Sequence, residues 1–220
     1  MSDRDERRRE KTARRGELSG AGPVREERAP ARFPGASAKF ALFGEVLTVG
    51  LLITLVGLLI ITLPTALVAG VRHMRRFVAA DDSNLRLFWA DVRAALVPGL
   101  VVGVATLAVT LLLLLDIDLA RSGYLPGGAL VEIVGWAGLA ALAVALLVVA
   151  SAWMPETGWR AAIRAVPAIV AADVAGALYV LATAVFVGVV TWALPPLFIP
   201  AIGCAVLAVV AIPVRRRRDA

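Results

Sequence analysis

The stretch LPTALVAGVRHMRRF, residues 63–77, decides the fold because its character changes halfway. Up to Val71 it is apolar, with one interruption at Pro64. From Arg72 onward it is basic and includes His73, the only histidine of the chain. Two interpretations follow. Either a helix that has crossed a membrane leaves it here, or the chain has already turned round and comes back at this point.

The composition places the chain in a membrane. Hydrophobic residues make up 60% of its 220 residues, whereas soluble domains are closer to half apolar. Several uncharged runs are long enough to cross a bilayer, because about 20 helical residues span its hydrocarbon layer. The sequence shows none of the short alternating strands that build a membrane barrel, so the spanning backbone is expected to be helical. We therefore predict an all-α, polytopic transmembrane helical bundle.

Four spans and their orientation follow from the apolar runs and the charges between them. Arginines are concentrated in residues 70–93, which hold five, and at the C-terminal end, which holds four. Basic residues favour the cytosolic side of a membrane, so the C-terminus is predicted to be cytosolic. A proline pair at positions 195 and 196 separates the last two spans, since proline ends a helix. The four spans are predicted at residues 94–115, 131–153, 166–194 and 197–214.

The first apolar region, residues 40–71, is ambiguous. It holds 32 residues, whereas two full spans and a turn need about 40 or more. A single crossing would place the N-terminal tail outside the cell. We favour an asymmetric hairpin in which Pro64 begins a shorter returning helix, because proline suits the first turn of a helix. The bundle then has five to six membrane segments and a cytosolic N-terminus.

The two ends of the chain differ from the membrane domain, which we assign to residues 39–214. Residues 1–39 carry eleven basic and seven acidic side chains, so residues 1–38 are predicted to be a disordered, charged, cytosolic tail. Residues 215–220 form a basic cytosolic tail. Mixed charge signs and a single aromatic residue argue against nucleic acid and favour anionic lipid at the cytosolic face.

Residues after the polar turn DDSN predict an amphipathic helix that leads into the second apolar region. Its apolar side includes Phe88 and Trp89, and Arg93 lies on the other side. Aromatic residues ringed by arginine are typical anchors of protein interfaces, so these three residues, with Arg75 and Arg76, are candidates for docking a partner. The same helix also suits the surface of an anionic bilayer, and this alternative stays open.

Ionisable residues inside membrane segments are the usual candidates for ion coupling or ligand binding. Asp173 and Glu45 are the candidates for such a role here. Asp173 lies in an apolar run longer than a bilayer requires, so its span could begin near residue 174 and leave Asp173 at the interface. An interfacial position explains both carboxylates without an ion pathway.

Signs of catalysis are missing from the sequence. His73 is expected to be a surface residue among arginines, without a second histidine to form a metal site. Cys204 lies in an apolar run and is expected to be a buried, inert thiol. No hydrolase, nucleotide-binding or paired-carboxylate motif is recognised. We therefore expect neither an enzyme nor a bound metal or cofactor.

The order of features from residue 40 to residue 99 is similar to the YesL-like family of bacterial integral membrane proteins. An apolar first helix is followed by TLPTALVAGVRHMRRF, the turn DDSN, the pair FW, and DVRAAL entering a span. The chain departs from that family in its charged tail and at Thr48 and Thr54. Members often lie beside genes of carbohydrate ABC importers. The resemblance thus implies a bacterial inner-membrane protein with an accessory role in sugar uptake, and it implies no catalytic residues.

Three functions remain as hypotheses. The leading one is an accessory or regulatory partner of a transporter, with an ABC-type transporter subunit as the protein that it binds. The second is a small secondary transporter with Asp173 as its coupling site. The third is a structural or assembly protein of the membrane.

Overall fold

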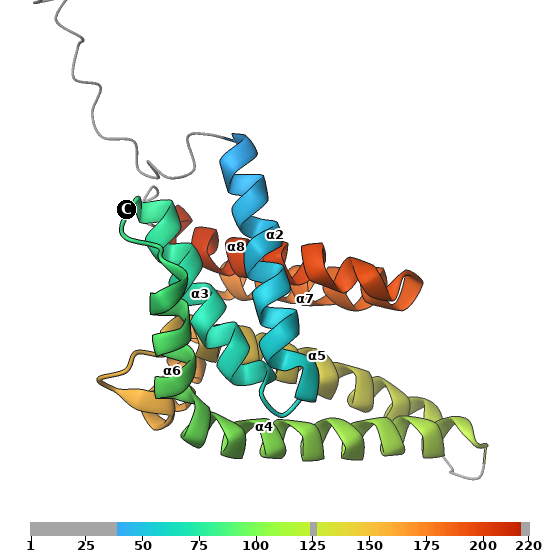
Figure 1. Cartoon of the computed structure of the whole chain (residues 1–220). Helices are drawn as coiled ribbons and strands as arrows, with labels where there is room; N and C mark the ends of the chain where they lie inside the picture. Colours follow the sequence, from blue (N-terminus) through green and yellow to red (C-terminus); the bar gives the residue numbers. More distant parts are fainter. Residues whose placement is uncertain (1–38, 124–126, 217–220) are drawn as a thin grey trace, which may run out of the picture. The chain divides into compact units, whose positions relative to one another are not determined.

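A computed structural model describes residues 39–123 and 127–216, and in this part of the chain the regular elements are all helices. The predicted all-α fold is confirmed. The described helices belong to one compact unit, and the predicted charged tail, residues 1–38, lies outside the described residues. Figure 1 shows the order of the elements. They are α2 (Lys39–Val56), η2 (Gly57–Leu59), α3 (Leu63–Ala79), α4 (Leu85–Arg121), α5 (Gly128–Ala152), α6 (Gly158–Ala172), α7 (Val174–Ala193), η3 (Pro195–Leu197) and α8 (Phe198–Arg216).

The first apolar region is a helical hairpin, as the sequence predicted. α2 ends at Val56, and α3 begins at Leu63 with Pro64 in its first turn, where the missing N–H of proline costs no hydrogen bond. Irregular backbone in an apolar environment must be covered by protein. α4 provides this cover, because a Cβ atom on Gly103 would lie only 1.7 Å from the carbonyl oxygen of Ile61. The turn is therefore sealed by a helix from further along the chain.

α3 is the most enclosed of the described helices. It packs against α2, α4, α5 and α8, and its first half is almost completely buried. Small side chains such as Ala66, Ala69 and Gly70 let neighbouring helices approach closely on several sides. Because α3 is central, the arginines at its end are also partly buried.

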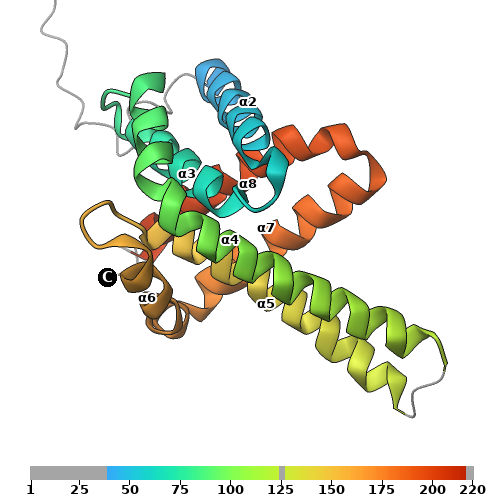
Figure 2. The same cartoon turned by 60° about the horizontal axis from the view of Figure 1, so that its bottom comes forward.

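α4 begins at Leu85, and the side chain of Asn84 caps it by accepting a hydrogen bond from the N–H of Arg86 at 3.0 Å. The predicted amphipathic helix and the predicted span at 94–115 are thus parts of one helix of 37 residues. Figure 1 shows that α4 changes direction between these two parts, and Pro98 lies inside it. Proline removes a backbone hydrogen bond and kinks a helix. After the bend, α4 and α5 run side by side as a hairpin (Figure 2).

The apolar run at residues 166–194 is divided into two helices, and its membrane-length part begins at residue 174, the start that the length of the run allowed. The chain is helical up to Ala172, breaks at Asp173, and becomes helical again from Val174. The break occurs because Asp173 adopts non-helical angles, φ −142° and ψ 76°, and its carboxylate caps α7 by accepting from the N–H of Gly176 at 2.8 Å. The apolar segment of this region that is long enough to cross a membrane is therefore α7 alone.

α7 and α8 form a third hairpin around the predicted proline turn, which is the short helix η3. α8 then packs against α2, so that the first and the last described helices are in contact. Two glycines make this contact close. A Cβ atom on Gly50 would lie 2.0 Å from the carbonyl oxygen of Ile199, and one on Gly203 would lie 2.1 Å from that of Val46.

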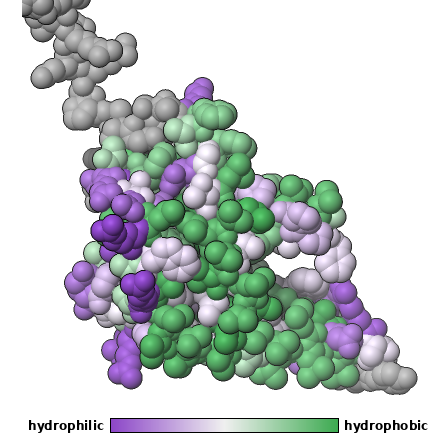
Figure 3. All heavy atoms as spheres, in the orientation of Figure 1, coloured by the Kyte–Doolittle hydropathy of each residue, from purple (hydrophilic) through white to green (hydrophobic). Residues whose placement is uncertain are grey.

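Five of the described helices are long and apolar enough to cross a membrane, which supports a multi-pass membrane protein. Apolar side chains cover most of the face shown in Figure 3, and hydrophilic ones gather along one edge and at the far end of the α4–α5 hairpin. Exposed apolar residues on this scale are expected only where lipid replaces water. The helices are, in order, Lys39–Leu59, Leu85–Arg121, Gly128–Ala152, Val174–Ala193 and Pro195–Ile212.

Candidate functional site

Residues of α2, α3 and α4 form a group of charged side chains that we call the polar cluster: Glu45, Arg72, His73, Arg75, Arg76 and Asp91. At its centre is Asp91 of α4, which is 5% exposed. Arg72 donates from Nε to one carboxylate oxygen of Asp91 at 2.9 Å, and Arg76 donates from Nη2 to the other at 2.6 Å. A buried carboxylate is stable only when it is paired and hydrogen-bonded in this way.

His73 and Glu45 form a second pair in the polar cluster, between α3 and α2. The Nε2 atom of His73 lies 2.5 Å from a carboxylate oxygen of Glu45. The His73 ring also packs against Phe88 in a T-shaped arrangement, with 6.1 Å between the ring centroids. The prediction of a surface histidine is wrong, because His73 is only 1% exposed. The prediction failed because α3 is covered on several sides, and a partner 28 residues away cannot be recognised from local sequence.

The third part of the polar cluster links α3 to the end of α5. Arg75 donates from Nη2 to the carbonyl oxygen of Ser151 at 2.6 Å, where the last carbonyls of a helix lack partners within it. The guanidinium of Arg72 lies over the ring of Trp153, 5.7 Å from its centroid, which is a favourable cation–π distance. Burial, and then the nearby Arg72 cation, lower the pKa of Arg75.

The predicted docking residues do not share one environment. Phe88 is completely buried against His73 and Trp89, so it cannot anchor a partner at the surface. Arg75 and Arg76 are half-buried and engaged within the polar cluster. Trp89 is 38% exposed, and Arg93 is exposed on the same helix. Of the five, Trp89 and Arg93 are thus the ones that a partner can reach most directly.

Asp173 and Glu45, the two candidate coupling residues, belong to different sites. Asp173 lies on the wall of a cavity of about 620 Å³ between α5, α6, α7 and α8. The other lining residues are mostly aliphatic, and Ser151 is among them. The prediction that a span begins near residue 174, with Asp173 just before it, agrees with the cap that this residue forms on α7.

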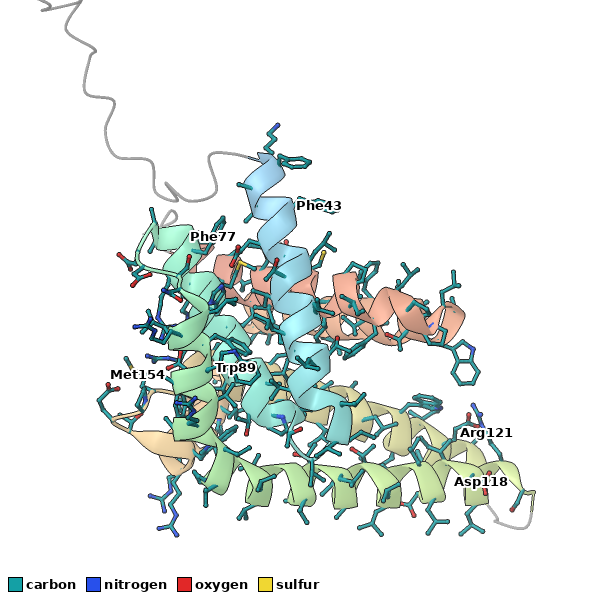
Figure 4. All side chains as sticks on the ribbon, viewed as in Figure 1. Phe43, Phe77, Trp89, Asp118, Arg121 and Met154 are labelled. Carbon is teal, nitrogen blue, oxygen red and sulfur yellow. The ribbon has the colours of Figure 1, made fainter. Side chains whose placement is uncertain are left out.

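The opposite end of the α4–α5 hairpin carries a smaller charged group. Arg121 lies 2.6 Å from a carboxylate oxygen of Glu132, and both side chains are partly exposed. The guanidinium of Arg121 also lies 5.8 Å from the ring centroid of Trp136. Figure 4 shows Asp118 and Arg121 at this end, whereas Trp89 and Met154 lie towards the other end.

Asp91 is the central residue that sequence reasoning missed, although a signal for it was present. Arg72 and Arg76 are four residues apart, so they lie on one face of a helix. Asp91 is the only carboxylate in residues 85–115. Two arginines on one face of an apolar helix require a nearby anion, and Asp91 is the carboxylate that the following helix offers.

Cys204 is exposed, so the prediction of a buried thiol is wrong; its side chain lines an open groove with residues of α7. Among the described residues, histidine, cysteine, aspartate and glutamate do not gather in threes that could hold a metal ion. Comparison with protein-family models, with curated proteins and with solved structures found no match.

Proposed function

We propose that this chain is an accessory or regulatory protein of the bacterial inner membrane that docks on a neighbouring transporter. The observation that carries the proposal is the polar cluster, which fastens the ends of α3, α4 and α5 together next to exposed Trp89 and Arg93. The resemblance of residues 40–99 to the YesL-like family suggests the kind of partner, a subunit of a carbohydrate ABC importer. The proposal assigns the chain no reaction of its own.

A fastened surface suits docking because little conformational freedom remains to be lost on binding. Tryptophan and arginine are also the residues that most often dominate binding energy at interfaces. Here Asp91 is held by two arginines, so α4 presents Trp89 and Arg93 from a fixed position. The connection between α7 and α8 is a weaker candidate for docking a partner, since it consists of apolar residues and prolines.

The proposed docking surface lies on the cytosolic side. It belongs to residues 70–93, which hold five arginines, and the positive-inside rule assigns such a segment to the cytosol. The α2–α3 hairpin returns to the side from which it starts, which supports a cytosolic N-terminus, and the basic C-terminal residues support a cytosolic C-terminus. Anionic lipid headgroups would lie around Arg86 and Arg93, which are both exposed.

A photo-cross-linking amino acid at Arg86 in native membranes tests the docking proposal. We expect it to capture a transporter subunit, and we expect Trp89→Ala combined with Arg93→Ala to reduce the yield at least several-fold. Trp136→Ala is the matched control, because Trp136 is 49% exposed at the other end of the hairpin. An unchanged yield in the double variant, or cross-links to lipid alone, would leave this surface with a lipid-binding role only.

A second candidate function is secondary transport, which is favoured by the cavity beside Asp173. A carboxylate on an apolar cavity wall within a membrane protein is a typical coupling site for protons or cations. Proteoliposomes with a pH-sensitive dye inside test this idea. Proton flux that depends on the protein and disappears in Asp173→Asn would support transport. Equal dye traces for wild type, the variant and empty liposomes would leave the docking function, or a purely structural role in membrane assembly.

A further inference from the structure

The cavity between α5, α6, α7 and α8 has a composition that docking does not require. Its volume of about 620 Å³ lies within the range of about 300–1,000 Å³ that is usual for small-molecule sites. Of the described residues that line it, Asp173 is the only charged one and Ser151 the only one with a hydroxyl group; the others are aliphatic or glycine. A wall that is apolar except for one or two polar groups is typical of a site for a mostly hydrophobic molecule.

The part of the wall that α7 contributes has a charged end and an apolar end. Asp173, Gly176, Ala177 and Val180 line the cavity, and their spacing of i, i+3, i+4 and i+7 places them on one face of the helix. Seven helical residues cover about 10 Å, and this length separates the carboxylate from Val180. A molecule that fits this face therefore has a polar head near Asp173 and a hydrocarbon part along α7.

The cavity has a buried side and an accessible side. Val148 of α5, Val180 of α7 and Val209 of α8 line the buried side. Ala168 and Ala172 of α6 also line the cavity, and they are exposed. A ligand can therefore enter beside α6 and place its apolar part against the other three helices.

α6 has the character of a helix at the membrane surface. It holds 15 residues and is not among the helices that could cross a membrane. Arg160 and Arg164 are exposed, whereas Trp159 and Ala162 are buried against the protein. Amphipathic helices of this kind lie at the boundary between lipid and water. The cavity is thus accessible at the depth where the head group of an amphiphile meets water.

The electrostatics around Asp173 favour a cation. One carboxylate oxygen accepts from the N–H of Gly176 at 2.8 Å, which compensates the positive N-terminal end of α7. A carboxylate accepts several hydrogen bonds at once, so the cap and a ligand can share it. The C-terminal end of α6, at Ala172, adds the partial negative charge of its last carbonyls. Arg75, the cation that contacts Ser151 of the wall, is engaged by the Ser151 carbonyl oxygen.

We propose that this cavity binds a hydrophobic amine, whose ammonium group pairs with Asp173 and whose hydrocarbon chain lies against α5, α7 and α8. The site is separate from the docking surface at Trp89 and Arg93. It requires no ion movement, so it holds whether or not Asp173→Asn changes proton flux. Two sources supply this chemistry: a free aliphatic amine, and the ethanolamine head group of a phospholipid.

A photoreactive aliphatic amine with a diazirine at the end of its chain tests the proposal on full-length protein in a non-ionic detergent. We expect mass spectrometry of the labelled peptides to place the label around Val180 and Val209, on the buried side of the cavity. An excess of octylamine should reduce this labelling at least several-fold, whereas octanol, which lacks the charge, should compete much less. Labelling spread over the exposed apolar faces of all the helices, or equal competition by the two compounds, would overturn the proposal.

Two variants separate the charge from the shape of the site. Asp173→Asn removes the charge but keeps a residue that caps α7, so the amine label should fall at least several-fold while a photoreactive alcohol of equal chain length labels as in wild type. Ala168→Leu fills the cavity and should reduce both labels. Ala182→Leu is the matched control, because Ala182 lies on α7 but lines the groove beside Cys204. Unchanged amine labelling in either folded variant would contradict the site, so each variant decides without the other.

Added lipid identifies the source of the ammonium group. Phosphatidylethanolamine should reduce labelling by the amine probe if the ligand is a lipid, and phosphatidylglycerol, which has no ammonium group, is the control. If octylamine competes and neither lipid does, the ligand is a free amine. Equal competition by both lipids would show that acyl chains alone fill the cavity, and it would overturn the role of Asp173.

Discussion

The carboxylate of Asp91 on α4 lies 2.9 Å from Nε of Arg72 on α3, across a sequence separation of 19 residues. This contact holds the first turns of α4 against the last turns of α3, before α4 enters its long apolar stretch. Arg76 completes the arrangement from one helical turn further along α3. Asp91 therefore balances two cations that would otherwise be packed together inside the protein.

Replacing Asp91 should destabilise the protein strongly. Asp91→Asn keeps the shape of the side chain but leaves two partly buried arginines without an anion. Breaking a buried ion pair from one side costs about 3–5 kcal/mol, and we expect the lower end because the arginines are partly exposed. Thermal unfolding in detergent measures the effect. Glu132→Gln, which breaks the more exposed pair at the other end, should change the melting temperature much less. Equal effects would contradict the central role of Asp91.

Glycines at helix crossings should tolerate no side chain. Gly103→Ala would place a methyl group 1.7 Å from the carbonyl oxygen of Ile61, and Gly203→Ala would place one 2.1 Å from that of Val46. Forcing extra atoms into a packed contact costs about 1–3 kcal/mol. Thermal stability should therefore fall in both variants. Gly188→Ala is the control, since its Cβ would meet nothing within 4 Å; a loss of the same size there would point to a general effect of glycine replacement.

The two ends of α4 should lie on opposite sides of the membrane. Ser83 precedes α4 and Ser122 follows it. With Cys204 replaced by alanine, an impermeant thiol reagent added to intact cells should label Ser122→Cys but not Ser83→Cys, because the basic residues flank Ser83. Ser19→Cys, in the N-terminal tail, should be protected like Ser83→Cys. Labelling at position 19 would mean that the tail is external, and labelling at 83 instead of 122 would reverse the whole orientation.

Substitutions at Asp173 should show that this residue stabilises the fold as the cap of α7. Asparagine caps a helix about as well as aspartate, whereas alanine at this position costs about 0.5–2 kcal/mol. If the role of Asp173 is to begin α7, then Asp173→Asn should match wild type in thermal unfolding and Asp173→Ala should be less stable. A clear loss of stability in Asp173→Asn would show that the negative charge itself is needed in the fold.

Much of the fold could be predicted because apolar periodicity and proline positions act locally. The hairpin at Pro64, the proline turn after α7 and the cap at Asn84 all follow from side chains within a few residues of the feature. Helix boundaries were less predictable. At Asp173 one capping carboxylate separates two helices, although the residues on both sides of it are apolar. Hydropathy alone does not reveal such a break.

The candidate site could be predicted only in part, since it depends on contacts between distant segments. The sequence shows that the end of α3 is basic, and it identifies Trp89 and Arg93 as candidates for docking a partner. The burial of His73 and Phe88 is not, because it depends on α2 and α4 closing around α3. Local charge suggested that His73 was exposed, and the tertiary packing places it inside with Glu45 as its partner.

The contact between α2 and α8 sets an order of events during synthesis. Val46 and Gly50 of α2 form a surface whose partner is the last described helix. About 150 residues separate Gly50 from Gly203, and a ribosome that adds about 5–20 residues per second needs roughly 8 to 30 seconds to make them. Throughout that time the first helix is in the bilayer without its final neighbour. The newly made chain therefore needs lipid or an insertion factor to occupy this surface until α8 emerges and displaces it.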